Sequence, residues 1–230
     1  MIALFDIGVV ACVLAAICAV ADWAAVIRRW KRVEYVCKPA TMVTLIAAAL
    51  FLTAGRGAVA FRAAFLLGLI FSLLGDIALM LPGERGFLPG LVAFLLGHLG
   101  YLTGFNLVLP PRSALILLPV IALLAVFILK RLIDGLVAHG ADHLRIPIIA
   151  YGGVLSLTLA SGWSTLFRPS WSPPARIAAV LGVTLFFASD LMLAWDRFVR
   201  RSHLLHVLVI ITYHLAQFAL TATLILGVGG

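Results

Sequence analysis

The sequence AVAFRAAFLLGLIFSLLGDIALML occupies residues 58–81 and decides the fold class. Only two of its residues, Arg62 and Asp76, are charged. A helix needs about 20 mostly apolar residues to cross the hydrocarbon core of a bilayer, and this stretch is long enough to do so. A strand of a membrane barrel would instead alternate apolar and polar residues. The stretch therefore predicts a transmembrane helix.

Seven further stretches of the chain have the same apolar character, and Gly or Pro residues mark four of the breaks between them, at residues 55–57, 82–83, 110–111 and 173–174. The eight predicted helices cover residues 2–27, 39–54, 58–81, 88–109, 114–129, 145–167, 176–195 and 204–228. Ala19-Val20-Ala21 is similar to a signal-peptidase site, but no Lys or Arg precedes the first apolar run, so we expect the first helix to be retained. The pattern predicts an all-α, polytopic membrane bundle of eight transmembrane helices, formed by one domain over residues 1–230.

The composition supports a bilayer as the main partner of the chain. Of its 230 residues, 64% are hydrophobic and 11% are charged, against about 45–50% and about 25% in soluble domains. A chain of this length has too little interior to hide so much apolar surface from water. A soluble enzyme, a disordered protein and a nucleic-acid binder are therefore excluded. Three cysteines are too few for a disulfide framework or a zinc site.

The net charge of +8 is explained by membrane topology. Twelve of the 17 Lys and Arg residues follow the first, third, fifth and seventh predicted helices, and the positive-inside rule assigns them to the cytoplasm. We therefore expect a bacterial cytoplasmic membrane protein with both termini outside. The twelve are Arg28, Arg29, Lys31, Arg32, Lys38, Arg85, Lys130, Arg131, Arg145, Arg197, Arg200 and Arg201.

Two aspartates lie inside predicted helices, and we assign the other seven acids to loops or helix ends. Asp76 and Asp190 each come five residues before the predicted end of a helix that runs toward the cytoplasm, about 8 Å deep. An ionisable group at membrane depth costs at least about 2.5–3.5 kcal/mol and normally faces the bundle interior for a functional reason. Each follows a small residue, Gly75 or Ser189, that lets a neighbouring helix approach.

The helices that follow these aspartates carry polar residues at the same predicted level. His98 and Tyr101 are three residues apart and share a helix face, as do Tyr213 and Gln217, four apart. An alternative face pairs His214 with Gln217.

The two halves of the chain also resemble each other in spacing. Asp76 precedes His98 by 22 residues, and Asp190 precedes Tyr213 by 23. This spacing fits a parallel four-plus-four duplication with a site between the two copies, although chance would also produce it.

An ordered set of short motifs extends from residue 38 to residue 217. The motifs are Lys38-Pro39, SLLGD with Asp76, FLLGHLGYL with His98 and Tyr101, Tyr151, SD with Asp190 and the RF after it, and YHLAQ with Tyr213 and Gln217. Together they resemble the YhhN-like lysoplasmalogenase family of integral membrane hydrolases. Val183, before the Ser189-Asp190 pair, stands where this resemblance leads us to expect a small Ala. The resemblance implies hydrolysis of the vinyl ether bond of a lysoplasmalogen, without a cofactor, to a fatty aldehyde and glycerophosphoethanolamine or glycerophosphocholine.

This chemistry requires an acid that protonates the β-carbon of the vinyl ether and an anion that stabilises the resulting cation and activates water. Glycosidases solve a similar problem with two carboxyl groups in different environments. We assign Asp190 as the acid and Asp76 as the base and cation stabiliser, although the sequence leaves the reverse assignment open. His98 would orient a carboxylate or relay a proton.

The same interpretation gives the remaining polar residues a role in holding substrate near the cytoplasmic surface. Arg197 or Arg200 would assist Lys38 at the phosphate. The residues assigned to substrate binding are Lys38, Tyr101, Tyr151, Tyr213 and Gln217.

Three other interpretations stay open at this point. Buried acids at a repeat interface also suit a proton-coupled transporter. A metal-dependent lipid hydrolase would use Asp76, His98, Asp190 and His214 as ligands, although the sequence has no HExxH motif. A structural membrane protein would leave the polar layer unexplained.

Overall fold

The computed structural model describes residues 2–138 and 140–227, and over these ranges it contains eight long helices and no strand. All eight are long and apolar enough to cross a membrane, which confirms the predicted all-α membrane bundle. The helices are α1 (Ile2–Arg28), α2 (Lys31–Leu52), α3 (Val59–Leu79), α4 (Glu84–Phe105), α5 (Leu117–Ala138), α6 (Arg145–Ser164), α7 (Pro173–Phe198) and α8 (His203–Gly227). The predicted end of the last helix, Val228, lies outside the described residues.

Two helices, α2 and α5, differ most in extent from the prediction. α2 begins at Lys31 rather than at residue 39, because its charged residues have partners: Lys31 Nζ lies 2.8 Å from Glu34 Oε2, and Lys38 pairs with a residue of α3. α5 continues past residue 129 to Ala138. Lys130 is exposed, so its long side chain can carry its charge to water while the helix continues.

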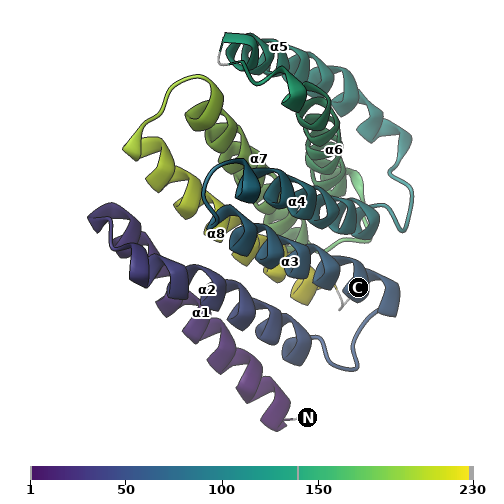
Figure 1. Ribbon diagram of the computed structural model, residues 1–230. Coiled ribbons are helices and arrows are strands. Elements are labelled where there is room, and N and C mark those ends of the chain that lie inside the picture. Colours follow the sequence, from purple (N-terminus) through teal and green to yellow (C-terminus); the bar gives the residue numbers. More distant parts are fainter. Residues whose placement is uncertain (1, 139, 228–230) are drawn as a thin grey trace.

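Consecutive helices pack as hairpins, with α1 on α2, α3 on α4 and α7 on α8. α8 is the most buried of the predicted spans and contacts α1, α2, α3 and α7. Figure 1 shows α1 at one edge of the bundle and α5 at the opposite edge, beside α6. α5 is the least buried span and packs mainly on α6. The polar residues of α8 therefore lie at the centre of the molecule.

Small residues bring α3 and α4 close together. The GxxxG sequence of Gly100 and Gly104 predicts close packing, and the structure shows it. A Cβ added at Gly100 would lie 2.8 Å from the backbone oxygen of Ala64, and one at Gly104 would lie 2.7 Å from the ring of Phe65. Both distances are shorter than van der Waals contact, so this α3–α4 interface requires glycine on α4.

We expect Gly100→Ala to destabilise the protein, because its methyl group would collide with backbone atoms that cannot move independently. Overpacking of this kind costs about 1–3 kcal/mol. Gly153→Ala is the matched control, since a Cβ there meets nothing within 4 Å and alanine favours a helix by about 0.5–1 kcal/mol. Unfolding of both purified variants in a detergent titration measures the difference. Equal stability of the two variants would contradict the tight α3–α4 contact.

Candidate active site

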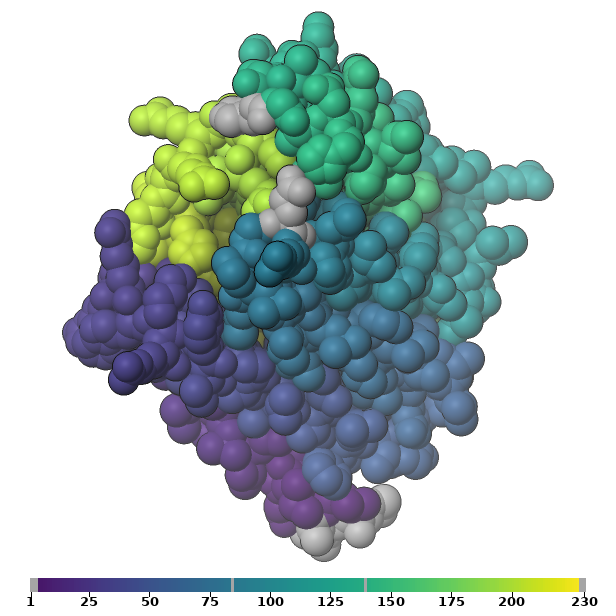
Figure 2. Space-filling model, in the orientation of Figure 1, coloured from purple at the N-terminus to yellow at the C-terminus, as the bar shows by residue number. Residues whose placement is uncertain are grey.

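Asp76 and Asp190 line the same polar cavity, which has a volume of about 360 Å³ and lies among α2, α3, α4, α7 and α8. Figure 2 shows the surface hollowed where α2, the start of α4 and the α7–α8 segment meet. Lys31, Arg197 and Arg201 also line this cavity. Asp76 and Asp190 therefore share a space whose walls include basic side chains from the start of α2, the end of α7 and the segment between α7 and α8.

Asp76 is buried and holds two partners from other helices. Lys38 Nζ, on α2, lies 3.1 Å from Asp76 Oδ1. The hydroxyl of Tyr213, on α8, donates a hydrogen bond of 2.6 Å to Asp76 Oδ2. The Lys38 ammonium also lies 5.9 Å from the centre of the Tyr213 ring. The positive charge of Lys38 thus offsets the negative charge of the buried Asp76 carboxylate. Lys38 and Tyr213 both contact this carboxylate directly.

Asp190 is more open to the cavity than Asp76 and has different partners. His98 Nε2, on α4, lies 3.1 Å from Asp190 Oδ2. The hydroxyl of Tyr151, on α6, donates to the same oxygen at 2.5 Å. Both contacts therefore converge on Oδ2, which leaves Oδ1 as the oxygen able to present a proton to a ligand.

Each of the two carboxyl groups contacts a residue from the other half of the chain. Asp76 precedes His98 in the sequence, yet it bonds to Tyr213; Asp190 precedes Tyr213, yet it contacts His98. α3 and α4 thus hold the acid and the histidine of two different pairs. The centre of the site lies between the α3–α4 and α7–α8 hairpins.

A narrow apolar crevice of about 80 Å³ adjoins the polar cavity and is bounded mainly by α4, α5, α6 and α7. Asp190 lines both spaces, and so does Phe94. Tyr151 lines the crevice but not the polar cavity. The Asp190 carboxyl group therefore stands where an apolar space meets a polar one.

Comparison with known proteins assigns the sequence to a family. The sequence pattern of the YhhN family matches residues 33–224. The chain belongs to the YhhN family. It is 33% identical over 152 residues to the mouse protein named lysoplasmalogenase TMEM86B, an alignment covering 66% of this chain and 59% of the mouse protein. The rat protein of the same name is 29% identical over 150 residues, covering 65% of this chain and 56% of its own.

The chain thus spans less than two thirds of the length of the curated relatives it matches. No solved structure matches this YhhN protein.

Tyr101 and Gln217 bond to each other in this YhhN protein rather than lining the polar cavity. The Tyr101 hydroxyl donates to Gln217 Oε1 at 2.7 Å, and both side chains are buried. The centre of the Phe186 ring lies 6.4 Å from that of the Tyr101 ring and 5.6 Å from that of the Tyr213 ring. Their assignment to substrate binding stays a prediction.

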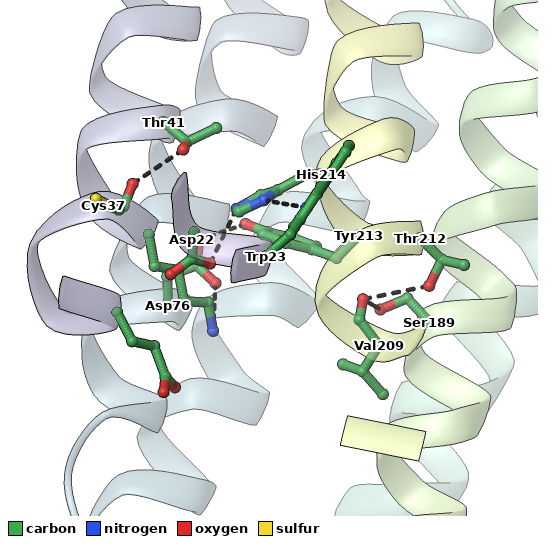
Figure 3. Close-up of polar contacts among 12 residues, drawn as sticks. Asp22, Trp23, Cys37, Thr41, Asp76, Ser189, Val209, Thr212, Tyr213 and His214 are labelled. Atoms are coloured by element: carbon green, nitrogen blue, oxygen red, sulfur yellow. Dashed lines mark hydrogen bonds and ion pairs between the residues drawn. The ribbon is translucent and has the colours of Figure 1, made fainter. Parts of the chain in front are cut away.

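The sequence analysis misses two buried acids, Asp22 and Glu34. It places Asp22 at a helix end, but the structure buries this residue completely beside His214 (Figure 3). His214 Nε2 lies 4.0 Å from Asp22 Oδ2, and the indole of Trp23 donates to His214 Nδ1 at 3.1 Å. A neutral His214 therefore carries its proton on Nε2, toward Asp22. The missed signal is the depth count, since Asp22 also lies five residues before its predicted helix end, residue 27.

The structure does not assemble the four-ligand metal site considered above. His98 contacts Asp190, whereas His214 lies with Trp23 and Asp22. Over the described ranges, 2–138 and 140–227, no three His, Cys, Asp or Glu side chains are grouped closely enough to hold a metal ion.

Proposed function

We propose that the protein hydrolyses the vinyl ether bond of lysoplasmalogens. One observation carries the proposal: the Asp190 carboxyl group lies at the boundary between an apolar crevice and a polar cavity. In a lysoplasmalogen, the vinyl ether likewise joins a hydrocarbon chain to a polar glycerophospho headgroup. A substrate that follows the polarity of the two spaces therefore places its reactive bond beside Asp190. The YhhN match and the names of the mouse and rat relatives agree with this substrate class.

The first step is protonation of carbon. Asp190 donates the proton of its Oδ1 to the β-carbon of the vinyl ether, and the α-carbon becomes an oxocarbenium ion. Tyr151 and His98 hold Oδ2 and so fix the direction of the acid. The ionised Asp190 that remains is close enough to the cation to stabilise it, as a glycosidase carboxylate does.

Water then attacks the α-carbon from the polar cavity. Asp76, which lines that cavity and whose charge is offset by Lys38, accepts the proton of the water. The resulting hemiacetal collapses when Asp76 passes its proton to the leaving glycerol oxygen and the hemiacetal hydroxyl gives its proton to Asp190. The products are a fatty aldehyde and a glycerophospho headgroup, and both carboxyl groups return to their starting states. Over the whole cycle, the reaction consumes one water molecule and no other reactant.

The phosphate of the substrate would lie at the basic wall of the cavity. Arg197 and Arg201 line this wall, as does Lys31, which also pairs with Glu34, and a phosphate oxygen is the ligand that such cations favour. The sequence analysis proposed Lys38 with Arg197 or Arg200. Lys38 lines the cavity and pairs with Asp76, so its role at the phosphate stays a prediction, and Arg201 rather than Arg200 lines the cavity.

The decisive test is aldehyde release by the purified protein in detergent or liposomes. The choline and ethanolamine lysoplasmalogens are supplied separately, each with and without a chelator, and a saturated alkyl ether of the same headgroup serves as the control substrate. We expect aldehyde from the vinyl ether alone, and no loss of the rate with chelator.

Two results would contradict the proposal. Folded protein that releases no aldehyde from either headgroup form would favour the transporter. Activity that is lost with chelator and restored by zinc would favour the metal-dependent hydrolase.

A further inference from the structure

Most of the residues that line the apolar crevice next to Asp190 take no part in the polar site. Its walls include Ala125 and Leu129 of α5, Gly152 and Leu155 of α6, and Phe187 of α7. Apart from Asp190, Tyr151 and Ser156, its lining side chains are apolar. The Ser156 hydroxyl donates to the backbone oxygen of Gly152, so it adds no free donor to the crevice.

We propose that this crevice holds the part of the substrate's hydrocarbon chain that is attached to the vinyl ether, and that Gly152 keeps it open. This inference rests on the proposed function, because it places the chain from the position of the reacting bond at Asp190. The crevice has a volume of only about 80 Å³, and its lining offers a phosphoglycerol group no cation. A linear apolar chain matches this lining.

The position of the crevice indicates how the chain reaches it. α5 forms one wall and is the helix most exposed at the edge of the bundle, opposite α1 (Figure 1). Its outer face carries large apolar side chains, among them Leu123, Val126 and Phe127, each more than half exposed. In a bilayer this face contacts lipid, so the remainder of a long chain can extend past α5 into the membrane. The headgroup stays in the polar cavity on the other side of Asp190.

Gly152 is the residue whose substitution would close the crevice. A Cβ added there would lie 3.1 Å from Leu129 Cδ2, so a larger side chain projects toward the α5 wall. Gly153 is the matched control on the same helix, since it is exposed and a Cβ there meets nothing within 4 Å. The three atoms nearest to a Cβ at Gly152 all belong to the flexible end of the Leu129 side chain, so the Cβ itself meets no backbone atom closely.

The first experiment compares Gly152→Leu with Gly153→Leu on two substrates, a long-chain lysoplasmalogen and a propenyl ether with the same headgroup. We expect Gly152→Leu to lower kcat/KM for the long-chain substrate by at least about tenfold, the order expected when a pocket loses room for a few methylenes. The propenyl ether and the Gly153→Leu variant should keep rates within about twofold of the wild type. Equal loss on both substrates, or no loss on the long chain, would overturn the inference.

The second experiment uses unmodified protein and does not depend on turnover. A saturated alkyl lysophospholipid carries a photoreactive diazirine on a chain carbon near the ether, and an excess of the plain lipid competes with it. We expect the competed cross-links to fall on the crevice walls of α5 and α6, at residues such as Leu129 and Leu155. Competed cross-links confined to the outer faces of other helices would overturn the inference even where aldehyde is released. Cross-links at the crevice without aldehyde release would support the chain site and reject the proposed reaction.

Discussion

Asp190→Asn is expected to reduce aldehyde release by about 10²–10⁴-fold, the range lost when a general acid is removed. Asparagine keeps the size of the side chain and can still accept the hydrogen bonds that Tyr151 and His98 direct at Oδ2. It cannot deliver a proton to carbon. The loss should therefore fall on kcat, with little change in KM, and initial rates of aldehyde formation over a range of lysoplasmalogen concentrations measure both.

Asp134→Asn is the matched control for this variant, because Asp134 is exposed on α5 and lines neither cavity. We expect it to keep the wild-type rate. Thermal unfolding of both variants shows whether the loss at Asp190 reflects chemistry rather than misfolding. Near-normal turnover of Asp190→Asn would remove this residue as the acid and return the role to Asp76, the assignment that the sequence left open.

The helices of the bundle were predictable because the membrane imposes a length and an apolar composition on each segment. The same physics made Asp76 and Asp190 conspicuous, since a carboxyl group inside a bilayer requires compensation. The same rule also applies to a third aspartate, Asp22. Asp22 satisfies the same depth count and is completely buried, although it was assigned to a helix end.

Partners across helices were not predictable in this way. Residues three or four apart share a face of one helix, but this does not say which other helix the face meets. The contacts of Asp76 with Tyr213 and of Asp190 with His98 depend on how the α3–α4 and α7–α8 hairpins are placed together. The early start of α2 also depends in part on a contact between helices, the pair of Lys38 with Asp76 on α3.

The apolar crevice also left no pattern in the sequence. Its lining residues come from several helices, and each is an ordinary apolar residue at its own position. Gly152 has the sequence environment of Gly153, yet only Gly152 faces another helix closely. Space between helices is a property of packing, and the sequence pattern of one helix cannot report it.

Lys38→Met is expected to destabilise the fold by about 3–5 kcal/mol, the loss measured when one member of a buried ion pair is removed. The Lys38 side chain is about 10% exposed and its ammonium lies 3.1 Å from Asp76 Oδ1. Methionine fills similar space but leaves the Asp76 carboxylate without its counter-charge. Unfolding in a detergent titration measures the change, and Lys130→Met, at an exposed lysine of α5, should change stability by less than about 0.5 kcal/mol.

The double variant Lys38→Met/Asp76→Asn separates the two roles that Lys38 could have. If Lys38 chiefly balances Asp76, removing the carboxylate charge as well should recover most of the lost stability, because no uncompensated charge remains. Turnover should stay low, since the proposed base is absent. If Lys38 instead served only to bind phosphate, Lys38→Met would raise KM and leave stability unchanged, and the second substitution would restore nothing. The sign of the interaction between the two substitutions thus decides whether the lysine belongs to the carboxylate or to the substrate.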